Sequence, residues 1–164
     1  RTQCAIVGVY ENDQFSPSAR VLDKTSKGYL RKVLKRGDIS GKTNQTLVLH
    51  DVPNVGATRV LLVGLGNEES MTSAKYTGIA RTVIGKMRAI SSRTNLCCLL
   101  EVDVPDRGID WKTQRIVESF EAGLYSFTEM KGNPPENTDS IESVDLFIDE
   151  LPTLIIIQFW FQLL

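Results

Sequence analysis

Two apolar segments joined by a short polar turn constrain the fold of this chain more than any other feature. They lie in the sequence TLVLHDVPNVGATRVLLVGLG, which covers Thr46–Gly66. The run Val60–Val63 has no polar residue, so both faces of the strand that it predicts must be covered, as in a sheet with helices on each side. Proline, asparagine and glycine predict a turn over Asp51–Thr58, which places strands at Gln45–His50 and Arg59–Leu65. These strands belong to the buried centre of a sheet.

The rest of the chain alternates strand-like and helix-like segments. Apolar, β-branched runs predict further strands at Cys4–Tyr10, Leu96–Leu100 and Val144–Ile148. Apolar residues at helical spacing predict helices at Ser18–Arg36, from a cap at Thr72 or Ser73 to Ile90, and at Asp110–Tyr125. This alternation is typical of an α/β domain with a mainly parallel or mixed central sheet and helices on both faces. The length of 164 residues suits one domain with its own core.

Composition excludes some classes of protein. The formal net charge is -1, so no overall charge draws the chain to nucleic acid or to a membrane surface. Three cysteines form no disulfide framework, and the neighbours Cys97 and Cys98 should point to opposite faces of a strand. No basic segment followed by an apolar stretch opens the sequence, so we expect no signal peptide, no membrane partner and a cytoplasmic location.

One local concentration of positive charge stands out within the first predicted helix. Its cations recur at steps of three and four residues, which would place them on one stripe of a continuous helix: Arg20, Lys24, Lys27, Arg31 and Lys35. Such a stripe could contact a nucleic-acid backbone, and the binding would weaken steeply with salt. The alternative is the solvated face of an amphipathic helix, which is what runs of charge usually are. The alternative agrees better with the balanced overall charge.

Other candidate residues offer little chemistry. Gly64-Leu65-Gly66 lies where a phosphate-binding turn would be, but a third glycine and a lysine are missing, so a simple strand exit is the better interpretation. His50 is the only histidine and its neighbour Asp51 would face the other way, so we expect a structural role. We therefore predict no catalytic residue and no metal ligand in this chain. Trp111, Tyr125 and Phe127 are expected to anchor the core or its rim.

Five blocks of sequence stand out by their order and spacing: Ser16–Lys42, Gln45–Val55, Arg59–Gly66, the helix Tyr76–Val83, and Trp111–Phe127. Together they resemble the N-terminal domain of the leucyl aminopeptidases, the cytosol aminopeptidases of peptidase family M17. The resemblance covers roughly Cys4–Thr153 and implies a macro-like fold, with a mixed central sheet flanked by helices on both faces. We therefore expect residues 1–153 to form this domain.

The resemblance also implies a function for the whole enzyme. Members of the family are exopeptidases that release N-terminal residues, preferentially leucine, through two divalent metals, Mn or Zn, held by a C-terminal catalytic domain. They assemble as homohexamers, and some bacterial members also bind DNA. The motifs that hold the metals do not occur in this sequence, so we expect a non-catalytic domain that is inactive alone and whose partner is the catalytic domain.

The last residues depart from the family pattern. Residues 154–164, LIIIQFWFQLL, are an atypical apolar tail where the family continues into a charged helix. The tail is too short to span a bilayer, which needs about 20 residues. Its uncharged, β-branched composition predicts either an extra strand or an aggregation-prone segment. We hypothesise a frameshift, a misread boundary or an early stop at Leu154, which sequencing of the coding region past Thr153 would test.

Overall fold

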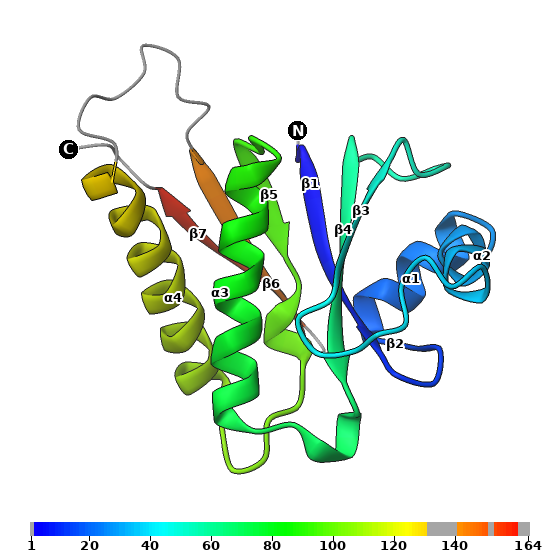
Figure 1. Ribbon diagram of the computed structural model, residues 1–164, viewed down its shortest axis with the longest axis horizontal. Coiled ribbons are helices and arrows are strands. Elements are labelled where there is room, and N and C mark those ends of the chain that lie inside the picture. Colours follow the sequence, from blue (N-terminus) through cyan, green and yellow to red (C-terminus); the bar gives the residue numbers. More distant parts are fainter. Residues whose placement is uncertain (1, 131–140, 151–152, 161–164) are drawn as a thin grey trace.

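A mixed seven-stranded sheet forms the centre of the molecule (Figure 1). The computed structural model describes residues 2–130, 141–150 and 153–160, with the side chains of 2–125 and 141–149. The strands are β1 (Cys4–Tyr10), β2 (Gln14–Phe15), β3 (Thr46–His50), β4 (Arg59–Gly66), β5 (Thr94–Cys97), β6 (Ser143–Glu150) and β7 (Thr153–Trp160). They lie in the order β3-β4-β1-β5-β6-β7, and β2 pairs with β1 outside this path.

The direction of the strands makes the sheet mixed, as the sequence predicts. β1 runs parallel to β4 and β5, and β5 runs parallel to β6. The edge strands β3 and β7 are antiparallel to their neighbours. The carboxyl ends of the four parallel strands therefore meet at one edge of the sheet, where ligand sites of open α/β folds usually lie.

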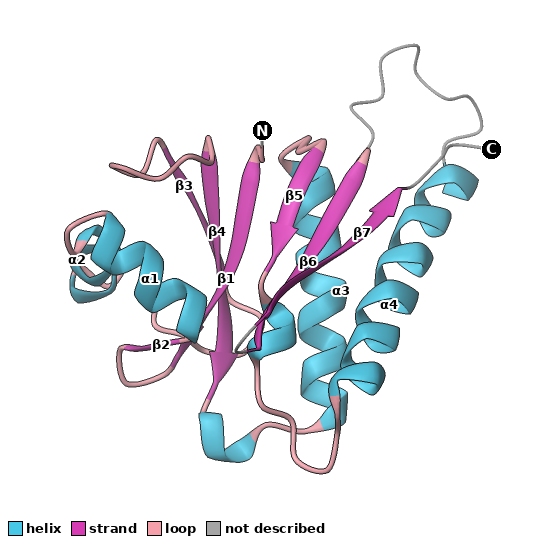
Figure 2. Cartoon of the chain, turned by 180° about the vertical axis from the view of Figure 1, so that it is seen from behind, coloured by secondary structure: helices cyan, strands magenta, loops and turns pink. Residues whose placement is uncertain are grey.

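Helices lie on both faces of the sheet (Figures 1 and 2). They are α1 (Pro17–Thr25), α2 (Tyr29–Lys35), α3 (Ser73–Ala89) and α4 (Ile109–Met130), with short 3₁₀ helices η1 (Glu68–Ser70) and η2 (Leu99–Glu101). One buried cluster joins α3 and α4 to the sheet, and a second joins α1 and α2 to the opposite face of β1, β3 and β4. The expected α/β architecture with a macro-like three-layer arrangement is confirmed. Within the described residues, no helix is both long and apolar enough to cross a membrane.

Helix α3 forms as its sequence predicts. The Thr72 hydroxyl accepts a hydrogen bond from the backbone N–H of Lys75, which satisfies one of the free donors at the helix start. The predicted apolar stripe faces the sheet: Tyr76, Ile79, Ala80, Val83, Ile84 and Met87 are buried, and Ile90 packs partly buried against the same cluster. Full burial of an isoleucine, valine or methionine side chain contributes about 1.5–3 kcal/mol.

The prediction of one continuous helix over Ser18–Arg36 is wrong, because the chain breaks between α1 and α2. Lys27 and Gly28 have φ angles of 55° and 81°, in the left-handed region. The N–H of Gly28 donates to the carbonyl of Asp23 at 2.7 Å, and this ends α1. The Asp23 carboxylate then accepts from the backbone N–H of Arg31 at 2.9 Å, so a side chain of α1 caps the start of α2. The cap fixes the second helix in a new direction.

The largest differences between predicted and observed strands concern the run Leu96–Leu100 and the tail. The apolar run Leu96–Leu100 does not continue as a strand: β5 ends at Cys97, and η2 turns the chain beside β6. β7 covers residues 153–160 and pairs with β6, so the predicted extra strand is observed over residues 154–160 of the tail. Residues 161–164 lie outside the described part of the chain.

Candidate functional sites

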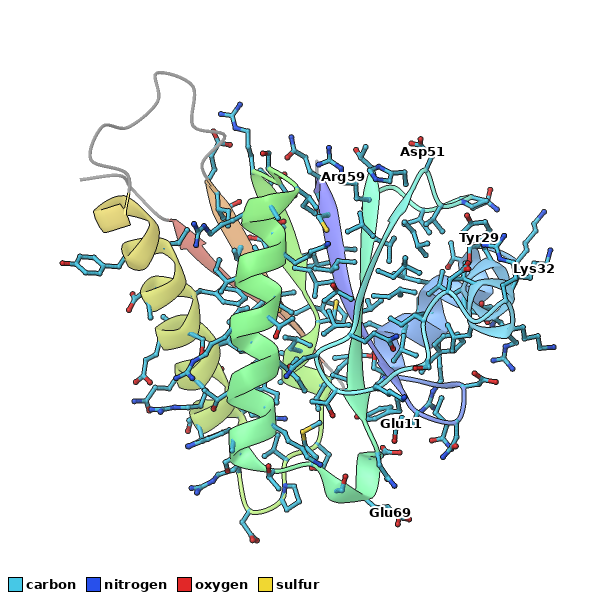
Figure 3. All side chains as sticks on the ribbon, in the orientation of Figure 1. Glu11, Tyr29, Lys32, Asp51, Arg59 and Glu69 are labelled. Carbon is cyan, nitrogen blue, oxygen red and sulfur yellow. The ribbon has the colours of Figure 1, made fainter. Side chains whose placement is uncertain are left out.

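The cations of the predicted stripe are divided between two helices and the turn that separates them. Arg20 and Lys24 belong to α1, Lys27 lies in the turn, and Arg31 and Lys35 belong to α2. All five are exposed. Their spacing along one helix, which suggested the stripe, is lost because the helix is broken. Figure 3 shows the neighbouring Lys32 on the outer side of α2, away from the sheet.

Two of these cations have partners within the fold. Arg31 forms an ion pair with Asp23 at 3.4 Å, and its guanidinium lies 5.6 Å from the centroid of the Phe15 ring. Arg20 donates from Nε to the carbonyl oxygen of Phe15 at 3.1 Å. These contacts attach α1 and α2 to β2, which gives both arginines a structural role.

The glycines of the Gly64-Leu65-Gly66 turn make room for another segment of the chain. The N–H of Gly64 donates to Gln45 at 2.7 Å, and the N–H of Gly66 donates to Gly41 at 2.8 Å. A Cβ at Gly64 would overlap the carbonyl oxygen of Lys42. Both N–H groups that a phosphate would need therefore bind backbone carbonyls. The strand-exit interpretation is supported by these contacts, and the sequence signal for it is the glycine itself, which marks close backbone approach.

His50 lies at the exposed end of β3. Its backbone pairs in register with Arg59 of β4. Asp51 follows with a φ of 50° and starts the turn back to β4, donating its N–H to Thr58 at 3.1 Å. Figure 3 shows Asp51 and Arg59 at this end of the molecule, distant from Glu69 at the carboxyl ends of the parallel strands. The histidine is therefore remote from the edge where ligands usually bind.

A cleft of about 360 Å³ opens at the carboxyl edge, between η2, the start of α4 and β6. Glu101 lines it and accepts hydrogen bonds from the backbone N–H of Ser18 at 3.0 Å and from its hydroxyl at 2.7 Å. Lys112, also in the cleft, donates to the carbonyls of Leu100 and Val102 at 2.6 and 3.1 Å. These two charged groups hold α1 and α4 against η2. Sequence reasoning missed both, since Ser18 and Glu101 are 83 residues apart.

A second, acidic groove of about 240 Å³ lies at the carboxyl ends of β1 and β4. Glu11, Glu68 and Glu69 line it, together with Tyr10, Asn12, Gln14 and Asn67. No group of three or more histidine, cysteine or acidic side chains that could hold a metal ion occurs among the described residues.

The three cysteines are buried thiols without disulfide partners. Cys97 belongs to the cluster under α3 and α4, whereas Cys98 belongs to the cluster under α1 and α2, so the predicted opposite orientation is confirmed. Burial raises the pKa of Cys4 to about 11 and that of Cys97 to about 12, and it also raises the pKa of Cys98. Thiols with such pKa values are protonated at neutral pH and are poor nucleophiles.

The predicted aromatic anchors differ in outcome. Trp111 is partly buried against the core, 5.9 Å from the Tyr76 ring, with the guanidinium groups of Arg107 and Arg115 at 5.1 and 5.8 Å from its own ring. It is a rim anchor, as predicted. The prediction for Tyr125 is wrong, because the residue is 65% exposed. The side chain of Phe127 lies outside the described residues.

Comparison with known proteins gives a consistent family. The profile of the "Cytosol aminopeptidase family, N-terminal domain" matches residues 6–134. A probable cytosol aminopeptidase of Aliivibrio fischeri (strain MJ11) is 42% identical over 136 residues, which are 83% of this chain and 27% of the relative. The chain thus spans about a quarter of the length of the curated relatives that it matches.

Solved structures agree on the fold. A mutant of tomato leucine aminopeptidase superposes with a TM-score of 0.67 at 22% identity, over 89% of this chain and 29% of that one. The macrodomain of Mycobacterium tuberculosis DarG superposes with a TM-score of 0.59 at 14% identity, over 74% of this chain and 82% of the macrodomain. At these identities the superpositions establish the fold alone, and the fold is macro-like. With the sequence matches, they lead to one conclusion: the chain belongs to the cytosol aminopeptidase family and carries its N-terminal domain.

Proposed function

We propose that this chain is a non-catalytic domain of a cytosolic leucyl aminopeptidase and that its role is to support the catalytic domain of the enzyme. The observation that carries this proposal is the family match over residues 6–134, which is specific to the N-terminal domain. The matched relative in Aliivibrio fischeri extends well beyond it, since this chain covers 27% of its length. The remaining length of such relatives has room for the machinery of peptide hydrolysis.

The finer features of the enzyme follow from this assignment. Residues 1–153 would form the domain and 154–164 its apolar tail. Two divalent metals, Mn or Zn, would be held by the catalytic domain and would activate the water that attacks the peptide bond. The domain would act in the cytoplasm, as part of a homohexamer, on peptides with an N-terminal leucine.

An activity assay tests the proposal. The purified chain is incubated with a chromogenic leucine amide in the presence of Mn²⁺ or Zn²⁺, with the intact Aliivibrio fischeri relative as the positive control. We expect no turnover above the rate in buffer. Turnover by the chain that approaches the rate of the relative would show that it carries its own catalytic site, and the proposal would be abandoned.

A further inference from the structure

The strand β7 lies at one end of the sheet and pairs with a single strand among the residues that the structure describes. That partner is β6, and the antiparallel register runs from Thr153 opposite Glu150 to Trp160 opposite Ser143. Figure 2 shows β7 on the side of β6 that faces away from β5. An edge strand presents a row of backbone N–H and C=O groups on its outer side, and a further strand can pair with them.

The sequence of β7 has none of the features that usually keep an edge strand from pairing. Natural sheets protect their edges with charged side chains, proline, bulges or short strands. The eight residues of β7, TLIIIQFW, include no charged residue and no proline, and their register with β6 is continuous. The opposite edge strand, β3, has five residues. Of the two edges, β7 is therefore the one that favours the addition of a strand.

The composition of β7 indicates what kind of strand fits its outer side. Cross-strand pairs of β-branched and aromatic residues stabilise a sheet, whereas an uncharged strand offers no ion pair to a charged segment. A second copy of β7 has the same length and the same apolar, β-branched and aromatic residues. No like charges oppose each other when the two copies pair, because β7 carries none. A second copy of the chain is therefore the partner that matches this edge.

We propose that two copies of this chain associate through β7, which pairs antiparallel with its own copy and joins the two sheets into one continuous sheet. A two-fold axis perpendicular to the sheet relates the copies, so the contact is closed and uses the same strand in both. The joined sheet then ends in the short strand β3 on each side. The inference concerns the edge of the sheet, goes beyond the proposed function and does not rest on it.

The symmetry of this contact determines which residues meet at its centre. Residues directly opposite each other in an antiparallel pair lie on the same face of the sheet, and successive residues alternate between the two faces. Around a two-fold axis, one residue of β7 must therefore lie opposite its own copy. In the two registers that pair the greatest length of β7, this residue is Ile156 or Ile157, at the middle of Thr153–Trp160.

Sedimentation velocity over a wide range of protein concentration tests the association. The proteins are the full unchanged chain, Ile156→Lys and the matched control Val21→Lys, in which the same charge replaces an apolar residue that is 62% exposed on α1. We expect the unchanged chain and V21K to form a dimer. I156K should raise the dissociation constant of the dimer about tenfold or more, because two like charges then lie near the axis. Circular dichroism and the urea midpoint show whether each variant is folded.

Disulfide trapping is a second measurement that adds no charge, and it decides the question if I156K does not fold. Single cysteines are introduced by Ile156→Cys, Ile157→Cys and Val21→Cys, and diamide is the oxidant. The native thiols are buried, so they do not compete. We expect I156C or I157C to form a covalent dimer under native conditions, since directly opposite residues lie within disulfide distance. V21C should form this dimer far more slowly on a non-reducing gel.

Three results would each overturn the inference. An unchanged chain that stays monomeric at every concentration would show that the outer side of β7 does not pair with a second copy. A dimer that is equally stable in I156K, without trapping in I156C or I157C, would place the contact elsewhere. Assembly beyond the dimer with loss of the native circular dichroism would show that the tail aggregates instead. The leucine amide assay concerns the proposed function alone, so the two proposals can fail separately.

Discussion

The carboxylate of Glu101 binds the first turn of α1 through Ser18. It accepts the backbone N–H of Ser18 with both oxygens, at 3.0 and 3.1 Å, and the Ser18 hydroxyl at 2.7 Å. The start of a helix carries partial positive charge and free N–H donors, and phosphates bind there in other α/β proteins. In this domain an internal carboxylate takes that place, which argues against a nucleotide phosphate at the same position.

Removing this carboxylate should destabilise the domain. We expect Glu101→Ala to lower the free energy of unfolding by about 1–3 kcal/mol, because the hydrogen bonds from Ser18 to a charged group are lost while the Ser16 cap of α1 remains. Glu101→Gln should cost less, since one amide oxygen can still accept. Urea denaturation measures the change, with the exposed Glu69→Ala as the control. Equal stability of E101A and the unchanged protein would show that the contact contributes nothing.

Two glycines should respond in opposite ways to alanine. A Cβ at Gly64 overlaps the carbonyl of Lys42, whereas a Cβ at Gly85 in α3 meets nothing within 4 Å. We expect Gly64→Ala to destabilise the protein by several kcal/mol or to prevent folding, because the clash is with backbone. Gly85→Ala should stabilise it by about 0.5–1 kcal/mol through helix propensity. Thermal unfolding of the two variants gives the comparison, and a shift of the same sign in both would contradict it.

Asp23 should be needed for the turn between α1 and α2. Its side chain is only 10% exposed, caps α2 at Arg31 and pairs with the guanidinium. We expect Asp23→Ala to cost about 1–2 kcal/mol, the usual effect of losing a helix cap. Asp103→Ala, at an exposed loop position without a left-handed backbone, serves as the control. Stability is read from the urea midpoint, and an unchanged midpoint for D23A would remove the capping role.

The contacts between Asp23 and Arg31 determine which cations can be substituted in a test of nucleic-acid binding. Reversal of Arg31 would break the pair with Asp23 and would confuse a loss of fold with a loss of binding. Lys24, Lys27 and Lys35 are exposed and are better targets. If the cations of α1 and α2 bind phosphate, changing these three lysines to glutamate abolishes salt-sensitive retention on immobilised DNA. Retention that does not change, or that the unchanged protein never shows, ends this hypothesis.

Stability should decline at alkaline pH. Burial raises the pKa of Cys4 from 9.0 to about 11, and burial with nearby Glu68, Glu101 and Asp103 raises the pKa of Tyr10 from 10.0 to about 12. The unfolded chain then loses these protons first, so the stabilising effect is complete below pH 9 and is lost as pH rises through the folded pKa values. Each group contributes a slope of roughly 1 kcal/mol per pH unit in its window.

Urea denaturation at pH 8 and pH 10.5 measures this decline. We expect the unfolding free energy to fall between the two values in the unchanged protein. Cys4→Ala should fall less steeply, because one of the groups that gains a proton on folding has been removed. An unfolding free energy that is constant or rises over this range would contradict the assignment of the shifts.

The parts of the fold that depend on local pattern could be predicted from the sequence. Helix α3 has a cap at Thr72 and an apolar stripe at helical spacing, so two independent sequence signals predict the same helix. β4 could be placed because its apolar run ends in glycine. The mixed sheet followed from alternating strands and helices. Each of these signals lies within a few residues of the feature that it predicts.

The features that were missed depend on contacts between distant residues. The break at Gly28 is stabilised by the hydrogen bond from the backbone N–H of Arg31 to the Asp23 carboxylate. Helical periodicity contains no signal for this bond. The predicted strand extended past the end of β5 at Cys97, because an apolar run is compatible with a buried turn as well as with a strand. The pairing of Glu101 with Ser18 joins segments that only the folded sheet brings together. A sequence pattern does not show which two polar residues will form such a contact, since many polar pairs in the chain could do so.

The burial of all three native thiols has a practical consequence for spectroscopy of this domain. Since Cys4, Cys97 and Cys98 are enclosed and protonated at neutral pH, maleimide dyes and spin labels should not modify the native protein. A single cysteine introduced on the surface would then be the one reactive attachment point, with no need to replace the native ones. Distance measurements between such probes can therefore follow the domain without disturbing its interior.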